Sequence, residues 1–288
     1  MRDLNYELKQ ICQHNRDGSY ATQSDRYAIL QGIANSLYDL GFRHMKAGSL
    51  KPKHIEALIT YYQDNGLADG TIKNRLSVIR WWSEKINKQN VVAKDNTYYG
   101  IGSREFVTNH SKSTELDDKK LNAIADPFIQ VSLLLQKAFG LRREEAIKFI
   151  PIYADQGKFI RLKASWCKGG KAREIPVRND EQRWVLDRAR LVAGQGSLIP
   201  QSYQYIQQLK LYERETAKVG LSRMHGLRHR YAQIRYQHLT GWAAPACGGK
   251  SSRELDEDEK SKDRLARLAI SQELGHEREQ ITAVYLGR

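Results

Sequence analysis

The first part of the chain carries apolar residues spaced three or four apart, which is the period of amphipathic helices. The pattern predicts helices over residues 25–40, 52–66 and 71–87. Proline at position 52 suits a first helical turn, and glycine at position 66 suits a helix end. The apolar stripes are Tyr27, Leu30, Ile33, Leu37 and Leu40, then Ile55, Leu58, Ile59 and Tyr62, then Ile72, Leu76, Ile79, Trp82 and Ile86. We therefore expect a small helical domain.

Between Val91 and Ser113 the helical period gives way to glycine, asparagine and other polar residues. Such composition is typical of a linker. A chain of 288 residues is long enough for two cores. We therefore place a boundary near residue 110, with a helical first domain over residues 1–110 and a second domain over residues 111–288.

The second domain is predicted to begin with a short helix that Thr114 or its neighbours could cap, followed by a longer helix after the cap Asp126. The longer segment, Phe128 to Ala138, is apolar on nearly every side, so it is expected at the domain centre. Alternating residues 160–166, the turn Gly169-Gly170 and the return after Glu174 predict a β-hairpin. Two more helices are expected over residues 184–192 and 203–219. The fold class is mainly α with one small β-hairpin, an α+β arrangement.

Lysine and arginine number 47 against 33 acidic residues, a net charge of +14 that is spread over both halves of the chain. This excess favours a polyanionic partner that touches both domains, although a basic membrane-surface protein would show the same total. The cysteines Cys12, Cys167 and Cys247 are isolated, so neither a disulfide framework nor a zinc knuckle is indicated. Without a signal peptide or a long apolar run, we expect a cytoplasmic protein.

Candidate chemistry gathers near the end of the chain around Tyr285. A phenol can form a covalent intermediate, and a phosphodiester under attack needs cations and proton donors nearby. His225 and Arg228 are three residues apart and share one helix face. His276 precedes Tyr285 by nine residues, across a helix end at Gly275 and a new short helix. Taken singly, each of these residues could equally serve packing or an ion pair.

Other basic residues also have two interpretations. Arg142 follows the central helix, where rigid packing would suit a phosphate contact, but it could simply pair with Glu144 or Glu145. Lys168 and Lys171 lie at the tip of the predicted hairpin and are either solvated or placed in a nucleic-acid groove.

The third predicted helix of the first domain has a basic face formed by Lys73, Arg75 and Arg80. This face could contact a DNA backbone, or it could be an ordinary solvated surface.

Taken together, these residues resemble the signature of the tyrosine recombinase (phage integrase) family. The matching boxes, in family order, are Gly140-Leu141-Arg142-x-x-Glu145, Lys168-Gly-Gly-Lys-x-Arg-x-Ile-Pro176, His225-x-Leu-Arg228-His229 and Leu274-Gly275-His276 with Tyr285. Each box alone is weak, whereas four in order are specific. The first domain resembles the core-binding domain of that family, so the resemblance covers nearly the whole chain.

The resemblance implies a site-specific recombinase that cleaves DNA through a 3'-phosphotyrosine on Tyr285. Arg142 and Arg228 would hold the nonbridging oxygens, and Lys168 would protonate the leaving 5'-oxygen. His225 and His276 would assist proton transfer. The resemblance gives Glu145 at most an orienting role behind these residues and makes His229 structural. No metal ion or other cofactor is implied.

The implied partner is double-stranded DNA with specific recombination sites, bound by a homo-tetramer. Accessory DNA-bending proteins are further candidate partners. The reaction would integrate or excise a mobile genetic element through a Holliday junction, in a bacterial or phage-encoded, nucleoid-associated protein. Two alternatives share the fold: an architectural DNA-binding factor without activity, and a strand-passing enzyme like the type IB topoisomerases. Tyr285 together with both arginines favours activity.

Two features depart from the family pattern. Fifty residues separate His225 from His276, and residues 241–262 are interpreted as an insertion that forms a polar surface loop, with its acidic stretch from Glu254 to Glu259 solvated. Only three residues follow Tyr285, whereas many members of the family pass a C-terminal segment to a neighbouring subunit. Two interpretations are open: the assembly is held in another way, for example by the insertion, or the tail has been lost.

Overall fold

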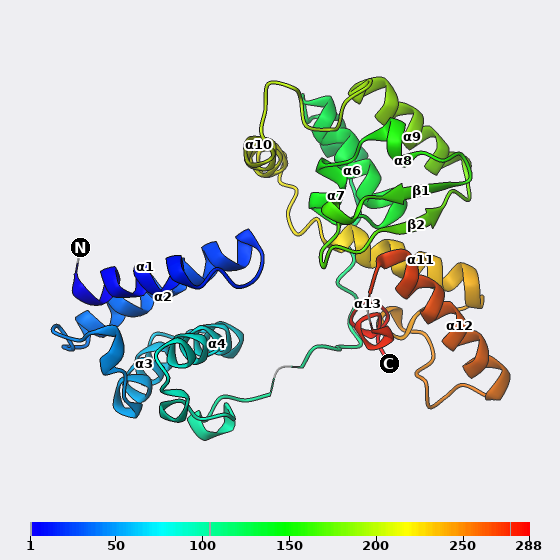
Figure 1. Cartoon of the computed structure of the whole chain (residues 1–288). Helices are drawn as coiled ribbons and strands as arrows, with labels where there is room; N and C mark the ends of the chain where they lie inside the picture. The colour runs from blue at the N-terminus through cyan, green and yellow to red at the C-terminus, as the bar shows by residue number, and fades with distance from the viewer. Residues whose placement is uncertain (1, 104, 277) are drawn as a thin grey trace. The chain divides into compact units, whose positions relative to one another are not determined.

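The computed structural model describes residues 2–103, 105–276 and 278–288. The chain divides into two compact units, Met1–Glu105 and Phe106–Arg288 (Figure 1). Each has its own hydrophobic core, and the chain is mostly helical with one small two-stranded sheet. None of the helices in the described ranges combines the length and apolarity needed to cross a membrane.

The N-terminal unit contains four α-helices and three short 3-10 turns among its described residues. These are α1 (Asp3–His14), α2 (Tyr20–Asp39), η1 (Ala47–Ser49), α3 (Pro52–Asp64), α4 (Asp69–Lys85), η2 (Gln89–Val91) and η3 (Thr97–Tyr99). The three predicted helices are present within a few residues of their predicted bounds. Trp82 and the leucines and isoleucines of α3 and α4 fill the core, as their spacing predicted.

Three details of this unit were predicted wrongly. Helix α1 was not predicted, although Leu4 and Leu8 lie four residues apart on its buried face. Tyr27 is 37% exposed and does not join the core. Part of the predicted linker also belongs to the unit, because Val92 and Ile101 are buried in its core. The sequence pattern did not indicate that these two residues are buried, because the residues around them are mostly polar or glycine.

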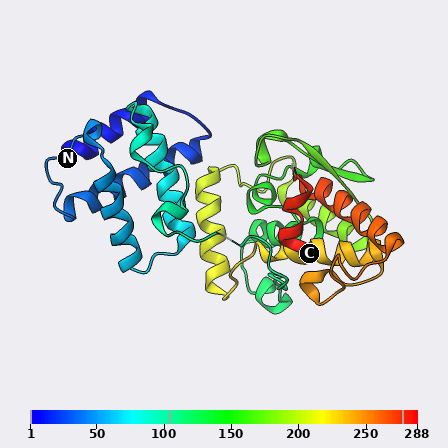
Figure 2. The same ribbon diagram turned by 90° about the horizontal axis from the view of Figure 1, so that it is seen from below.

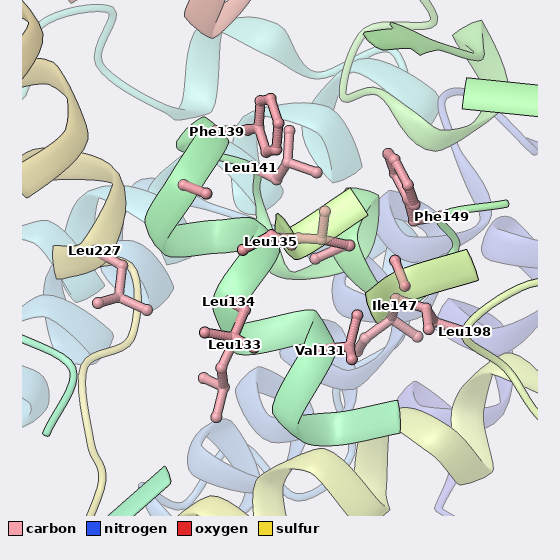
Figure 3. Packing of buried hydrophobic residues seen from close by; sticks show 14 of the residues in the cluster. Val131, Leu133, Leu134, Leu135, Phe139, Leu141, Ile147, Phe149, Leu198 and Leu227 are labelled. Carbon is pink, nitrogen blue, oxygen red and sulfur yellow. The ribbon is translucent and has the colours of Figure 1, made fainter. Parts of the chain in front are cut away.

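The C-terminal unit is built around α6, which is apolar on nearly all sides. Its elements in chain order are α5 (Asp118–Asn122), α6 (Pro127–Phe139), α7 (Arg143–Ile147), α8 (Pro151–Ala154), β1 (Phe159–Leu162), η4 (Ala164–Trp166), β2 (Arg173–Pro176), α9 (Asp180–Ala193), α10 (Tyr205–Lys218), α11 (Gly226–Thr240), η5 (Pro245–Cys247), α12 (Glu257–Leu274), η6 (Glu279–Ile281) and α13 (Ala283–Leu286). Figure 3 shows leucines of α6 among side chains from α7, α11 and neighbouring loops.

The cap Asp126 accepts a hydrogen bond from Ile129 N, as predicted. The preceding helix α5 is capped by Asp117 and not by Thr114.

The predicted hairpin exists, but it is shorter than the alternation suggested. Strands β1 and β2 pair antiparallel from Phe159 opposite Pro176 to Leu162 opposite Arg173. Beyond Leu162 the chain turns into η4, where Trp166 packs its ring against Phe149 at a centroid distance of 6.1 Å. A ten-residue loop therefore connects the strands in place of a tight turn at Gly169-Gly170.

The interpretation of residues 241–262 as a surface loop was wrong for the end of the segment. Residues 241–256 contain only the short turn η5, and the acidic residues 254 and 256–258 are exposed as expected, but residues 257–262 are helical. Asp256 accepts a hydrogen bond from Glu259 N and starts the eighteen-residue helix α12, whose first turn is acidic. Acidic side chains are favourable there because the amino end of a helix carries partial positive charge. Earlier in the segment, Ala244 and Leu255 are buried. The Asp-x-x-Glu capping pattern was readable in the sequence.

The end of the chain returns to the centre of this unit. Figures 1 and 2 both show α13 beside α11, and the two helices share a buried cluster with α12. Gly275 ends α12 in the left-handed conformation, and η6 and α13 follow at once, as the sequence indicated. This reversal brings Tyr285 back towards the first turn of α11.

Candidate active site

Arg228, in the first turn of α11, is only 1% exposed. Its Nη1 donates to the carbonyl oxygen of Gly140 at 2.5 Å, and its Nη2 donates to the carbonyl oxygen of Leu274. These carbonyls lie at the carboxyl ends of α6 and α12, where the helix dipoles are negative. Burial and the nearby charge of Arg142 lower the pKa of Arg228 to about 10, so it remains a cation at neutral pH.

Two glycines allow this arrangement. Gly140 and Gly275 both adopt positive φ, at 62° and 64°. A Cβ on Gly140 would lie 2.6 Å from Cδ1 of Tyr231, and one on Gly275 would lie 2.8 Å from Cδ of Arg173. A larger residue at either position would have a strained backbone and would clash with these side chains. Both positions of the signature therefore require glycine.

The hydroxyl of Tyr285 points into this cluster. Its oxygen is 3.2 Å from Nε2 of His225 and 3.4 Å from Nε of Arg228. Two imidazoles pack against the phenol ring, with centroid distances of 4.4 Å to His229 and 5.1 Å to His276. Its backbone carbonyl accepts a hydrogen bond from Gln233 on α11. Tyr285 is 7% exposed, so its position is fixed on several sides.

The tautomer of His276 follows from its neighbours. Its Nε2 lies 3.4 Å from Nη2 of Arg228, which can only donate, so this nitrogen carries the lone pair. The proton is therefore on Nδ1, which donates to Oγ1 of Thr282 at 3.0 Å. Burial and Arg228 lower the pKa of His276 to about 3. Burial followed by the charge of Arg228 also lowers the pKa of His225. Both rings are neutral at pH 7.

Arg142 is held by a carboxylate that is itself shared. Glu145 is completely buried; its Oε1 accepts from Nη1 of Arg142 at 2.8 Å, and its Oε2 accepts from the backbone nitrogen of Arg142 at 2.7 Å. Arg173 adds a bidentate pair to the same carboxylate at 2.9 and 2.7 Å. Although burial opposes the charge, the hydrogen bonds and charge of Arg173 lower the pKa of Glu145 to about 2. The ion pair between Arg142 and Glu145, which was one of the two interpretations of Arg142, therefore exists. The positive charge of Arg142 also acts on Arg228 and His225, the residues next to the Tyr285 hydroxyl.

The remaining basic candidates lie elsewhere. Lys168 and Lys171 are exposed in the β1–β2 loop, and within the described residues no hydrogen bond joins Lys168 to the Tyr285 cluster. In the N-terminal unit, Lys73 donates to the carbonyl of Gly102 and Arg75 stacks on Tyr62 at 4.3 Å.

Arg80, the third candidate DNA contact of the N-terminal unit, is hydrogen-bonded within that unit. Its guanidinium donates to the carbonyl of Ala93 and to the side chain of Asn96. It therefore anchors the segment after α4, and a contact with another molecule would compete with these bonds.

The structure thus brings together Arg142, His225, Arg228, His276 and Tyr285. Three further contributors received no role in the sequence analysis: Arg173, Glu273 and Thr282. Arg173 stands inside the second signature box, so a signal for it was available. The carboxylate of Glu273 accepts hydrogen bonds from Tyr231, Arg178 and Arg235. These residues are far apart in the sequence, so no local sequence motif indicates that they meet.

The cluster presents cations and neutral imidazoles around a phenol. Both Nη atoms of Arg228 donate to carbonyls, so an incoming oxyanion would meet the guanidinium mainly through the N–H groups that are directed at Tyr285 and His276. Among the described residues, no group of three or more histidine, cysteine or acidic side chains is arranged to hold a metal ion. The arrangement is suited to binding an anionic group beside a nucleophilic hydroxyl.

The two-unit, mostly helical fold is that of the integrase class of proteins. Two family models match the chain, "Phage integrase, N-terminal" over residues 1–92 and "Integrase" over residues 102–234. The chain belongs to the phage integrase, or tyrosine recombinase, family. The second match ends before His276 and Tyr285, whose placement therefore comes from the structure alone. A search of curated proteins found no match.

Several solved structures share the fold. A lambda integrase dimer bound to a COC' core site has a TM-score of 0.65 and 15% identity, covering 99% of this chain and 78% of that one. A lambda integrase tetramer bound to a Holliday junction has a TM-score of 0.61 and 14% identity, with coverage of 96% and 78%. The Tn1549 transposon integrase in complex with circular intermediate DNA has a TM-score of 0.59 and 12% identity, with coverage of 100% and 96%.

Proposed function

We propose that this protein is a site-specific recombinase that cuts and rejoins DNA through a covalent bond to Tyr285. The observation that carries this proposal is that the Tyr285 hydroxyl lies within 3.4 Å of both Nε2 of His225 and Nε of Arg228, and that the charge of Arg142 acts on the same Arg228. A hydroxyl, a neutral imidazole and guanidinium cations lie close together, which supports the roles of nucleophile, proton acceptor and phosphate-binding groups.

In the proposed cleavage step, the phenol oxygen attacks the phosphorus of a DNA diester. Its proton passes to Nε2 of His225, which is neutral and oriented to accept it. Arg142 and Arg228 hold the nonbridging oxygens, on which negative charge increases. His276 supports this geometry because its ring is fixed between Arg228 and Thr282.

The bond from phosphorus to the 5'-oxygen breaks as the bond to Tyr285 forms. The products are a 3'-phosphotyrosine and a 5'-hydroxyl, whose proton we assign to Lys168. Lys168 is exposed in its loop, so this assignment requires the loop to meet the bound DNA. Rejoining is the same step in reverse with a new 5'-hydroxyl, and the phosphotyrosine conserves the bond energy.

The N-terminal unit, including Lys73 and Arg75, is proposed to hold the same duplex from a second side. The net charge of +14 is spread over both units, which suits such a grip. By analogy with the DNA complexes of lambda integrase and the Tn1549 integrase, we propose assembly as a homo-tetramer on two recombination sites and a role in integrating or excising a mobile element.

The decisive test is covalent capture on a nicked suicide duplex drawn from the flanks of the gene. Wild type should give a protein–DNA adduct that survives denaturing electrophoresis. Tyr285→Phe should bind the duplex normally and give none, since only the nucleophilic oxygen is removed. Adducts at wild-type level in the variant would refute the assignment, and a wild type without adducts on any flank would favour an architectural factor.

A further inference from the structure

Arg173 makes four side-chain hydrogen bonds close to the site, although it was not assigned to the chemistry. Its side chain is 7% exposed. Nε donates to the carbonyl of Glu273 at 2.9 Å, Nη1 and Nη2 both reach Glu145, and Nη1 also lies 3.2 Å from Sγ of Cys167. One guanidinium thus joins the carboxyl end of α12, the carboxylate that holds Arg142, and the β1–β2 loop.

The contact between Arg173 and Cys167 joins the two ends of the segment 167–173. Arg173 is the first residue of β2, and Cys167 is the residue before Lys168. The first half of the loop is anchored independently, because Trp166 packs against Phe149 and Tyr153. Residues 168–172 are all exposed, and the backbone nitrogen of Gly170 donates to the carbonyl of Cys167, so the position of this segment follows that of Cys167, which Arg173 contacts.

The approach of Arg173 to α12 is equally constrained. Its Cδ passes over Gly275, where even a Cβ would lie only 2.8 Å away. The neighbouring carbonyl of Leu274 accepts from Arg228. Arg173 and Arg228 therefore bind successive carbonyls at the end of one helix, which links the loop directly to the tyrosine cluster.

We propose that Arg173 is a positioning residue that sets the Lys168 loop relative to Arg142 and Arg228. It touches no reacting atom. This inference rests on the proposed function, in which Lys168 protonates the leaving 5'-oxygen. If Arg173 only stabilised the fold, its loss would slow every substrate alike.

The test compares two suicide duplexes in single-turnover cleavage, one ordinary and one with sulfur as the 5'-bridging atom. The sulfur leaving group departs without a proton, so it bypasses Lys168. Arg173→Met removes the guanidinium and keeps much of the stem, and Arg173→Lys retains the charge. Lys168→Ala is the reference for a lost proton donor, and Arg161→Met is the matched control, since Arg161 forms an exposed pair with Glu174 in the same sheet.

Both Arg173 variants are expected to slow ordinary DNA and to raise the ratio of sulfur to oxygen rates by about tenfold or more, in the same direction as Lys168→Ala. Arg161→Met should leave both rates unchanged. Thermal unfolding is measured for each variant, and if Arg173→Met fails to fold, Arg173→Lys carries the comparison. An unchanged ratio in a folded Arg173 variant, with rescue in Lys168→Ala, would overturn the positioning role. Absence of rescue in Lys168→Ala would instead refute the proposed proton donor.

Discussion

The most quantitative prediction concerns Glu145→Gln. Glu145 is fully buried and accepts hydrogen bonds from both Arg142 and Arg173. Its pKa falls from an ordinary 4.5 to about 2 in the folded protein. Because the folded pKa is depressed, the carboxylate stabilises the fold above pH 4.5, and this stabilisation is lost as the pH falls towards 2.

The pKa difference corresponds to about 3 kcal/mol of folding free energy at neutral pH, and to about 1 kcal/mol at about pH 3, where the unfolded state is already protonated. Replacing the carboxylate with an amide should therefore destabilise the C-terminal unit by about 3 kcal/mol at pH 7. The loss should shrink by about 2 kcal/mol when the pH is lowered to about 3.

Urea unfolding at the two pH values measures this difference, with the C-terminal unit fitted as its own transition because the chain has two cores. The matched control is Glu174→Gln. Glu174 also pairs with an arginine of the same sheet, but both side chains are about half exposed, so its loss should cost under about 1 kcal/mol at either pH. A loss for Glu145→Gln that is equal at both pH values would show that packing, and not the carboxylate charge, is responsible.

Three further outcomes are expected. Arg142→Ala and Arg228→Ala should each slow covalent capture by about 10²–10³-fold, as one lost oxyanion donor does; near-normal rates would leave only a structural role. Because the pKa of His225 is lowered below 6.5, the capture rate should not fall from about pH 8 to about pH 6.5 and should decline only below that, and an earlier decline would contradict its role as proton acceptor. The slope of log Kd for DNA against log salt should be steeper for the whole chain than for residues 106–288, and equal slopes would exclude DNA contacts by the N-terminal unit.

The sequence predicted the helices whose apolar residues follow one period. Helix α3 begins at its predicted proline, and α6 was placed at the domain centre because it is apolar all round. The failures share a cause. Helix α12 and the buried Ala244 lie in a stretch whose average composition is polar, and averaging conceals both a helix cap and single buried residues.

The candidate site was partly visible because its members occur in short boxes with fixed spacing. What the sequence could not provide was the relation between boxes. Arg173 and Glu145 are 28 residues apart, and Arg173 and Glu273 are 100 residues apart, yet one guanidinium binds both. The predicted hairpin tip was also too tight, because the burial of Trp166 ends the strand alternation early.

The charges at the site suit an anion that gains charge during reaction. Arg142, Arg173 and Arg228 face a single carboxylate, Glu145, while His225 and His276 are neutral, so two positive charges remain unbalanced. A DNA diester brings one negative charge. In the proposed reaction, attack by the phenol oxygen adds a second negative charge at phosphorus while the phenol proton makes His225 a cation, so the net charge of the site stays the same. What changes is its distribution, because negative charge gathers on the phosphoryl oxygens that Arg142 and Arg228 would hold, and their attraction is stronger in the transition state than in the bound substrate. Interactions that strengthen in this way accelerate a reaction, whereas uniform binding does not. Shared between Arg142 and Arg173, Glu145 keeps both arginines in place and removes only one of their charges.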